Sequence, residues 1–395
     1  MLRNDKFRVL NLLLMTIGLA ILVCNYLMIP NTYMDRIAAD KFGNRSWEYK
    51  NDTKRDEPLQ LKHYDNVFSS RSQENKVLQN SSLQMHEENL TSVLLKGKRK
   101  NEFNLNKAQT VTNKTYVCAK WDLGRLGNKL FIYASLFGIT KKTNTTFVIE
   151  ENAEIRNYFK YLKAEIIPQN NKICQDVTYV SEKESCCSFD PGFYNFTKNR
   201  NVKQTSYLQS YYYFKDVEDD IREQFTFKDE IVINARQKIL TALNDYRHNY
   251  SSSEIVGVHV RLGDKLDHSE VAHGNVVASA EFYNRSMNYF RMKLKNPIFL
   301  IVMSWHKEED IKWVKQHVTG DDVVLLGSNP LEVDLCALTL CNHTIMSTGT
   351  FGWWGAWLCN GTTIYCKDFA AKGSNLAAMY SKDLKFHFPP NWIGM

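Results

Sequence analysis

The hydrophobic positions at the start of the chain form one unbroken run. Residues 9–29 carry no charged side chain over 21 positions, and as a helix they would reach about 30 Å, enough to cross a bilayer. Arg3, Lys6 and Arg8 precede the run, so the positive-inside rule predicts a cytoplasmic tail over residues 1–8 and a lumenal or extracellular body. A cleaved signal peptide is the alternative, but its apolar region is usually about 7–15 residues long. We therefore expect a type II transmembrane signal anchor.

The pattern turns polar after this run and stays polar to about residue 112. The stretch is rich in Asn, Lys, Glu, Ser and Gln and has no strong apolar period, which is typical of a chain that cannot bury a core. We predict a disordered, glycosylated stem over residues 30–112.

Short β-rich runs alternate with amphipathic helical stretches from residue 113 to the end. This alternation predicts an α/β body of two lobes, residues 113–250 and 251–395. The clearest series starts at Val323 and reads as a strand, a helix near Leu331, a strand (HTIMS), a helix (WWGAWLC) and a strand (TTIYC). A βαβαβ order predicts a parallel sheet.

Composition narrows the class of protein further. Hydrophobic residues make up 44% and charged residues 24% of the chain, with a formal net charge of +7. These values exclude disorder throughout, collagen and a polytopic membrane protein. The mild basic excess fits an anionic small ligand or a membrane-proximal surface, and no basic cluster suggests a nucleic-acid groove.

Glycosylation sequons and cysteines both favour a secretory compartment. Eleven Asn-x-Ser/Thr acceptor sites are present, at Asn44, Asn51, Asn80, Asn89, Asn113, Asn144, Asn195, Asn249, Asn284, Asn342 and Asn360. Cys24 lies in the predicted anchor, and an even set of eight remains: Cys118, Cys174, Cys186, Cys187, Cys336, Cys341, Cys359 and Cys366. No CxxC pair suggests zinc, so we expect disulfides of undetermined connectivity. Cys359 with Cys366 would close a short helix-to-strand turn.

The first candidate functional element follows a short strand that ends near Ala119. Gly124, Arg125, Gly127 and Asn128 lie between this strand and a predicted helix. The glycines permit a tight turn, and the helix start offers amides to an anion or a sugar hydroxyl. Ordinary turn chemistry is the alternative, and Arg125 shifts the balance towards a binding loop.

The sharpest candidate is the sequence EIVGVHVRLGD. Ile255–Val260 reads as a buried strand, with His259, Arg261 and Asp264 at its C-terminal end, where open α/β sheets bind ligands. Arg261 offers a bidentate cation for a phosphate or pyrophosphate, and Asp264 can accept a proton. A structural Arg–Asp ion pair at the strand end is the alternative.

A third candidate lies between the last predicted strands. Ser347, Thr348 and Thr350 supply hydroxyls, Gly349 allows close backbone approach, and Phe351 opens the following helix. Together they resemble a phosphate cradle without a Walker lysine. The alternative is a Ser/Thr helix cap before a buried Trp353–Trp354 helix, and the two interpretations are compatible.

Two further patterns carry less weight. The aromatic run Tyr207–Phe214 could stack on sugar faces, but buried core is the commoner explanation. No Asp-x-Asp pair, GxxxxGK[ST] or HExxH occurs, so neutralisation of phosphate would depend on arginine and helix ends, with no divalent metal expected.

These motifs, in this order, resemble the animal galactoside 2-α-L-fucosyltransferases, the α-1,2-fucosyltransferases of glycosyltransferase family 11. The resemblance rests on GVHVRLGD, on Gly274–Val277 (GNVV) and on DLCALTLCNHTIMSTGTFGWWGAWL, with GRLGNKLFIYA and YLQSYYYF in support. It covers about residues 115–395.

The resemblance implies a metal-independent inverting enzyme with two Rossmann-type lobes in a GT-B-like arrangement. It would move L-fucose from GDP-β-L-fucose to the 2-hydroxyl of a terminal galactose, in the Golgi membrane. By analogy, Arg261 contacts the β-phosphate and is the first catalytic candidate, while His259 and Asp334 lie by the nucleotide. Ser347–Phe351, including Thr348, Gly349 and Thr350, line the diphosphate, and Gly124–Asn128 face the fucose and acceptor. Asp264 is the tentative base, with His259 and Glu270 as alternatives.

Departures from the family pattern leave other functions open. Leu262 replaces a usual second arginine, Lys265 replaces a usual tyrosine, and Ser304–His306 replaces a polar pair. Arg125 or Lys265 could supply the lost cation. The alternatives are a transferase with another GDP-sugar or acceptor linkage, and an inactive sugar-binding type II membrane protein.

Overall fold

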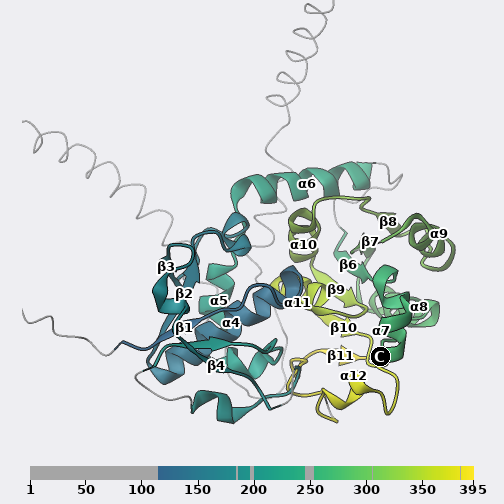
Figure 1. The fold of residues 1–395 in the computed structure, drawn as a ribbon. Helices are drawn as coiled ribbons and strands as arrows, with labels where there is room; N and C mark the ends of the chain where they lie inside the picture. The colour runs from purple at the N-terminus through teal and green to yellow at the C-terminus, as the bar shows by residue number, and fades with distance from the viewer. Residues whose placement is uncertain (1–113, 184–185, 196–199, 245–252, 305, 383) are drawn as a thin grey trace, which may run out of the picture. The chain divides into compact units, whose positions relative to one another are not determined.

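The computed structural model describes residues 114–395 except 184–185, 196–199, 245–252, 305 and 383 (Figure 1). The predicted tail, anchor and stem lie outside these residues, as do Asn44, Asn51, Asn80, Asn89, Asn113 and Asn249. No helix within the described part is both long and apolar enough to span a membrane. The described residues belong to one compact unit, Ala108–Met395.

The first half of this unit forms a five-stranded sheet in the order β3-β2-β1-β5-β4, in which every neighbouring pair is parallel. Its strands are β1 (Tyr116–Cys118), β2 (Thr146–Glu150), β3 (Glu165–Ile167), β4 (Thr178–Val180) and β5 (Val202–Gln204). The helices of this half are α4 (Leu126–Thr143), α5 (Glu218–Gln224) and α6 (Asp229–Asn244). The strand order reverses at β1, and the segment from Gly124 to Asn128 follows the carboxyl end of that strand.

The second half forms a six-stranded parallel sheet in the order β11-β10-β9-β6-β7-β8. Its strands are β6 (Ile255–Val260), β7 (Ile298–Met303), β8 (Val323–Leu325), β9 (His343–Met346), β10 (Thr363–Tyr365) and β11 (Ile393–Gly394). Its helices are α7 (His268–His273), α8 (Ala280–Lys293), α9 (Glu308–His317), α10 (Leu331–Thr339), α11 (Thr350–Cys359) and α12 (Asn375–Ala378). This is the doubly wound order, with its switch point between β6 and β9. The predicted α/β class with parallel sheets is confirmed.

Alternation along β6 places its side chains on two different faces. Val256, Val258 and Val260 pack in the core cluster that includes residues of α8. His259 points to the opposite face, where a Cβ on Gly352 of α11 would come within 2.3 Å of its ring. The two-residue period therefore places the valines of β6 against α8 and His259 on the opposite face, towards α11.

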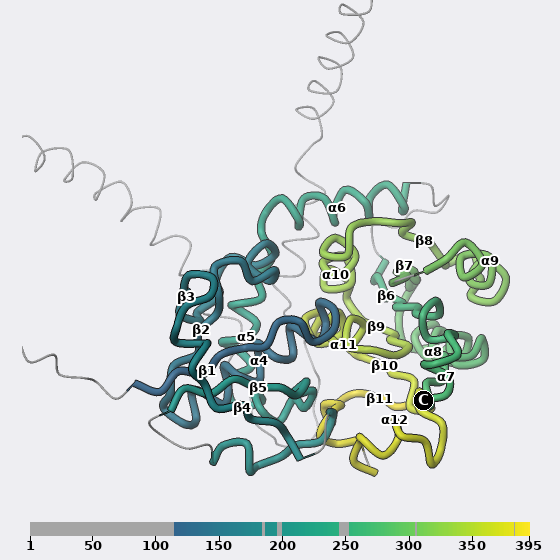
Figure 2. Tube along the Cα trace, in the orientation of Figure 1, coloured from purple at the N-terminus to yellow at the C-terminus, as the bar shows by residue number. Residues whose placement is uncertain are grey.

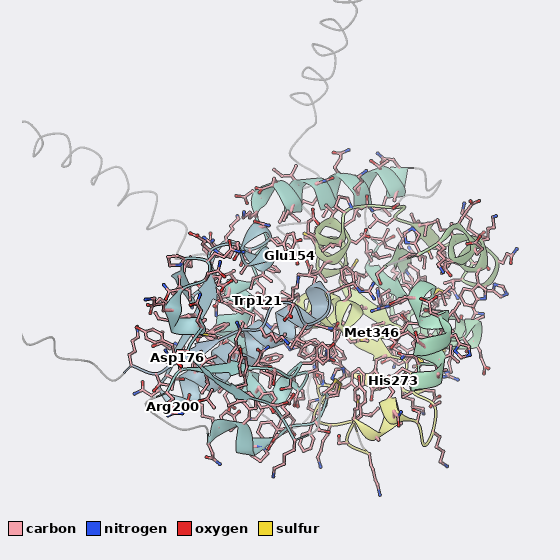
Figure 3. The ribbon with its side chains drawn as sticks, viewed as in Figure 1. Trp121, Glu154, Asp176, Arg200, His273 and Met346 are labelled. Carbon is pink, nitrogen blue, oxygen red and sulfur yellow. A yellow bond between two sulfur atoms is a disulfide. The ribbon has the colours of Figure 1, made fainter. Side chains whose placement is uncertain are left out.

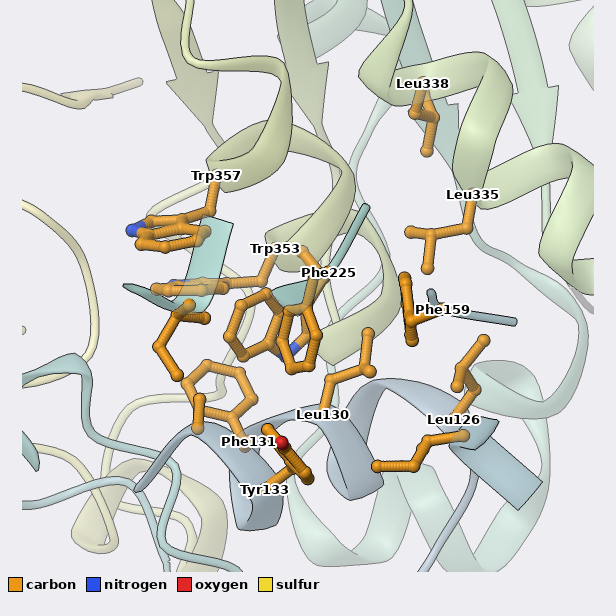
Figure 4. Packing of buried hydrophobic residues seen from close by; sticks show 14 of the residues in the cluster. Leu126, Leu130, Phe131, Tyr133, Phe159, Phe225, Leu335, Leu338, Trp353 and Trp357 are labelled. Carbon is orange, nitrogen blue, oxygen red and sulfur yellow. The ribbon is translucent and has the colours of Figure 1, made fainter. Parts of the chain in front are cut away.

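The largest core cluster joins α4 to α11 (Figure 4). Phe131 of α4 lies 4.5 Å from Trp353 and 5.1 Å from Trp354, measured between ring centroids. Both tryptophans are fully buried, so the predicted buried Trp helix is confirmed. The predicted Ser/Thr cap is wrong, because the N-cap of α11 is Gly349. The hydroxyl of Thr350 instead donates to Asn128 Oδ1 at 2.7 Å.

The cysteines pair differently from the proposed short clip. Cys118 bonds to Cys174, and Cys186 bonds to its neighbour Cys187. Cys359 and Cys366 are free thiols, so a clip between them is wrong. Cys359 lies in the core cluster of α4 and α11, and Cys366 in that of α8, so the two cysteines face different sides of the sheet.

The C-terminal segment returns to the first half of the unit after α12 (Figure 2). The amide of Tyr211 and the hydroxyl of Ser210 both donate to the carbonyl of Phe386. His387 Nδ1 lies 2.7 Å from the carbonyl of Gln209. These contacts fix the segment that carries the aromatic run, and thus one wall of the cavity described next.

Candidate active site

A cavity of about 830 Å³ opens where the carboxyl ends of β6 and β9 meet the starts of α4 and α11. Glu154 and His273, labelled in Figure 3, line it from the first and second halves of the unit. The residues predicted from the sequence that line it are Gly124, Arg125, Gly127, Asn128, Arg261, Asp264, Asp334, Thr348, Gly349, Thr350 and Phe351. His259 and Ser347 do not line it. The volume suits a ligand larger than a monosaccharide.

Two helices begin at this cavity and nearly touch. A Cβ on Gly127 would lie 2.6 Å from the carbonyl carbon of Thr350 and 2.7 Å from the nitrogen of Phe351, so only glycine permits this approach. The N-cap residues, Arg125 and Gly349, form no side-chain cap. Amides at the start of a helix, together with its dipole, favour bound anions. The arrangement is therefore suited to a phosphate-bearing ligand.

Asn128 connects the two helix starts. Its Oδ1 accepts hydrogen bonds from Thr350 Oγ1 at 2.7 Å and from Gln209 Nε2 at 3.1 Å. Gly124 has a φ of +69°, and a Cβ there would come within 1.9 Å of Asn128 Nδ2. The glycine thus supplies both the left-handed backbone and the space that Asn128 needs.

Asp264 lies between two guanidinium groups. Arg261 donates to it twice, from Nε at 3.2 Å and from Nη2 at 2.8 Å, and Arg125 also pairs with its Oδ2. Burial raises the pKa of the Asp264 carboxyl, but the hydrogen bonds and charges of Arg261 and Arg125 outweigh burial and leave that pKa below its usual value. The ion-pair interpretation is confirmed, and Asp264 is a weak candidate for a general base.

Arg261 is held so that its guanidinium reaches the cavity. A Cβ on Gly349, whose φ is +86°, would lie 2.6 Å from Arg261 Nη1. The backbone amide of Arg261 donates to Ser347 Oγ at 3.2 Å. Ser347 thus contacts the backbone of Arg261 and does not itself line the cavity.

His259 is fully buried behind the wall as well. Its Nε2 lies 2.7 Å from Ser304 Oγ, and its Nδ1 lies 3.4 Å from Ser347 Oγ. Burial and the charge of Arg261 lower the pKa of His259 to about 3, so the ring stays neutral. His259 does not line the cavity, and its ring nitrogens instead lie against Ser304 and Ser347.

A second carboxylate lies on the exposed side of the cavity. Glu270 Oε2 accepts from Lys265 Nζ at 2.6 Å and from Asn275 Nδ2 at 3.0 Å. Its side chain is 38% exposed. One cation, that of Lys265, pairs with Glu270, whereas two guanidiniums pair with Asp264. The carboxylate of Glu270 is therefore the better placed of the two to accept a proton.

Asp334 lines the opposite end of the site, at the start of α10. Burial raises its pKa to about 7, while a hydrogen bond from Asn329 Nδ2 to its Oδ1 at 2.9 Å opposes this effect. Its charge is therefore sensitive to pH near neutrality.

The residues that depart from the family pattern lie in two different places. Leu262 is buried in the core cluster of α8, whereas Lys265, Ser304 and His306 line the cavity.

Several lining residues had no sequence signal. Cys186, Tyr380 and His387 lie far apart in the chain and meet only through tertiary contacts, whereas Tyr207 and Gln209 belong to the aromatic run considered as a sugar-stacking segment. Gln209 lies within the aromatic run, where Tyr211, Tyr213 and Phe214 are buried core. Among the residues that the structure describes, no group of three or more His, Cys, Asp or Glu side chains could hold a metal ion.

Comparison with known proteins agrees with this geometry. The family model described as glycosyl transferase family 11 matches residues 90–395. Galactoside alpha-(1,2)-fucosyltransferase 1 of Bos taurus is 28% identical over 306 residues, 72% of this chain and 80% of the relative. Galactoside alpha-(1,2)-fucosyltransferase 2 of Pongo pygmaeus is 28% identical over 288 residues, 69% of this chain and 77% of the relative.

Among solved structures, POFUT1 in complex with GDP-fucose aligns with a TM-score of 0.42 and 9% identity, over 63% of this chain and 95% of that one. The family match spans most of the chain, including both sheets and every residue of the cavity. This chain therefore belongs to glycosyl transferase family 11.

Proposed function

We propose that this glycosyltransferase moves L-fucose from GDP-β-L-fucose to the 2-hydroxyl of a terminal galactose on glycoprotein or glycolipid glycans, giving an α-1,2-fucoside. One observation carries the proposal. The starts of α4 and α11, neither of which has a side-chain cap, meet at one cavity that Arg125 and Arg261 also line. The names of the relatives support fucose as the transferred sugar, a galactoside as the acceptor and the α-1,2 linkage.

The donor would lie across the switch point of the second sheet, as ligands do in doubly wound folds. Arg261 and the amides at the start of α11 would hold the β-phosphate, and Asp334 would accept from the guanine. Arg125 and Asn128 would then face the fucose and acceptor from the first half of the unit, in a GT-B-like arrangement. No divalent metal is required in this scheme, because arginine and helix starts neutralise the diphosphate.

Transfer would proceed with inversion. The acceptor oxygen attacks C1 of fucose as the bond from C1 to the β-phosphate oxygen breaks, and GDP leaves with the electron pair. Negative charge grows on that phosphate, so donors already in place beside it stabilise the transition state. We infer that Glu270 takes the acceptor proton, because Asp264 is held between two guanidiniums and His259 is buried off the cavity.

Replacement of Glu270 tests this assignment. E270Q should lower kcat about 10²–10⁴-fold and leave GDP affinity within about twofold, since the residue would contact the acceptor and not the nucleotide. Calorimetric titration with GDP and initial-rate kinetics measure the two quantities. Unchanged kcat in E270Q would remove Glu270 from the proton transfer.

We also propose a Golgi membrane location, with the body lumenal and residues 9–29 as the anchor. The apolar run, the flanking positive charges and the sequon density support this location.

The function is tested by transfer from labelled GDP-fucose to a panel of terminal β-galactosides, with GDP-mannose as competitor and with EDTA. EDTA-resistant fucose transfer to galactose supports the proposal. Transfer to another acceptor, or GDP binding without turnover, would favour the alternatives that Leu262 raises.

A further inference from the structure

A second cavity, of about 380 Å³, lies at the opposite end of α11 from the candidate active site. Thr350, the first residue of α11, lines the first cavity, whereas Trp357 and Asn360 line the second. A helix of 10 residues is about 15 Å long, and no residue lines both cavities. The second cavity is therefore a separate feature from the candidate active site.

Aromatic and proline side chains form much of its wall. Trp357 and Tyr211 are almost fully buried, and Trp392 is half-buried. The amide of Trp392 donates to the carbonyl of Pro389 at 3.1 Å, which fixes the turn that brings the indole to the cavity. Of these three rings, Trp392 has the exposed surface, so it is the one that can present a flat apolar face with little conformational freedom to lose.

Two charged groups complete the wall. The guanidinium carbon of Arg222 lies 3.8 Å from the centroid of the Trp357 ring, and its Nη1 donates to the carbonyl of Trp357 at 2.6 Å. Glu218 pairs with Arg222 at 4.0 Å, and their side chains are 39% and 25% exposed. A pyranose has C–H faces that pack on aromatic rings and hydroxyl or amide groups that pair with such charges. The cavity has the chemistry and, at the lower end of the usual range of about 300–1,000 Å³, the size of a small sugar site.

The chain itself supplies an attachment point for a sugar at this cavity. Asn360 lines it, is exposed, and begins the sequon Asn360-Gly361-Thr362. Asn360 is the C-cap of α11, with a φ of +58°, and its side chain leaves the helix end towards solvent. A glycan on this asparagine would start at the mouth of the cavity.

We propose that Asn360 carries an N-linked glycan whose first sugar residues occupy the second cavity and stabilise the fold by covering Trp392 and pairing with Arg222 and Glu218. The inference rests on the proposed lumenal location of the body but not on the transfer reaction, because it concerns a different cavity and a different ligand.

Asn144 provides a matched control. It is also an exposed sequon asparagine at a helix C-cap, with a φ of +54° against +58° for Asn360. It lines neither cavity. The isosteric changes N144D and N360D remove the acceptor nitrogen from the same backbone conformation, which aspartate tolerates as asparagine does. Any difference between the variants then reports the cavity.

The test uses the full chain made in eukaryotic cells and purified in detergent. Glycopeptide mass spectrometry should find Asn360 occupied, and N360D should lower the melting temperature at least about 2 °C more than N144D does. In a W392A background the effect of N360D should shrink, because the two changes remove one contact. On the folded wild-type protein, an endoglycosidase should release the Asn360 glycan at least tenfold more slowly than the Asn144 glycan. An unoccupied Asn360, or equal melting and release at the two sites, would overturn the proposal.

Discussion

Asp264 is the residue whose surroundings most change the chemistry expected of the site. An aspartate beside a strand end can be a base, but two guanidiniums on one carboxylate keep it ionised and unreactive. The carboxylate brings Arg261 together with Arg125, which comes from the other half of the unit. That Arg125 compensates for the arginine replaced by Leu262 stays a prediction.

Arg261 should be required for turnover. R261A should lower kcat by at least about 10²–10³-fold, since a preorganised donor to the leaving phosphate is lost, and R261K should recover only part of it because lysine lacks the bidentate fork. Initial rates at saturating donor measure the effect, and circular dichroism verifies the fold. R291A is the matched control, because it removes another bidentate pair, that of Arg291 with Asp322 at 2.7 Å, away from both cavities. Wild-type turnover in R261A would exclude the phosphate role.

Asp334 should make donor binding depend on pH. Its pKa is raised to about 7, so the folded protein holds it protonated below that pH, whereas guanine N–H donors need the carboxylate. GDP affinity should therefore rise about tenfold between pH 6 and pH 8, as the ionised fraction does. D334N should weaken binding about tenfold or more at pH 8 and leave only the shallower pH dependence that comes from the terminal phosphate of GDP, whose second pKa is about 6. Calorimetry across this range decides the matter, and an unchanged slope in D334N would contradict the assignment.

At the scale of elements, the site is built where the starts of α4 and α11 meet. Gly127 permits the contact, and Asn128 joins both helices to the aromatic segment through Thr350 and Gln209. Buried hydrogen bonds between elements fix geometry as well as adding stability. Small changes at this contact should therefore affect binding more than folding.

Substitution of Gly124 tests this contact. G124A places a methyl group 1.9 Å from Asn128 Nδ2, so it should displace Asn128 and reduce kcat/KM at least tenfold. Its matched control is G373A, at a φ of +76° with no atom within 4 Å of the added Cβ. Both variants incur a left-handed strain of about 1–2 kcal/mol, so any further loss of melting temperature or activity in G124A reports the Asn128 contact. Equal activity in the two variants would show that the Asn128 contact is unimportant.

At the scale of the whole molecule, local patterns predicted the helices and strands but not the contacts between those far apart in the chain. Ile255–Val260, the strand at His343 and the helix after Gly349 were predicted from apolar runs and glycines. The alternation along β6 also predicts that His259 faces away from Val258 and Val260. We grouped His259 with Arg261 instead, because the two residues are close in the sequence. The predicted pairing of Cys359 with Cys366 was wrong, because two residues close in the chain can lie on opposite faces of a sheet.

No pattern in the sequence predicted that the C-terminal segment returns to the first half of the unit. The hydroxyl of Ser210 donates to the carbonyl of Phe386, and His387 Nδ1 lies within hydrogen-bond distance of the carbonyl of Gln209. Every residue has a backbone carbonyl, so the sequence does not show which one a distant side chain will contact. The meeting of Arg125 with Asp264 likewise depends on how the two halves of the unit pack. Side-chain chemistry identified most of the candidate site, whereas tertiary contacts between residues far apart in the chain decided which residues lie together.

The most direct measurement is the structure of the product made by the full chain from GDP-β-L-fucose and a β-galactoside. Two-dimensional NMR of the purified product reports both the anomeric configuration and the linked carbon. We expect an α-fucosyl residue on O2 of galactose, which requires inversion at C1 and the proposed acceptor position. A β-linkage, a different linked carbon, or release of free fucose alone would contradict the account.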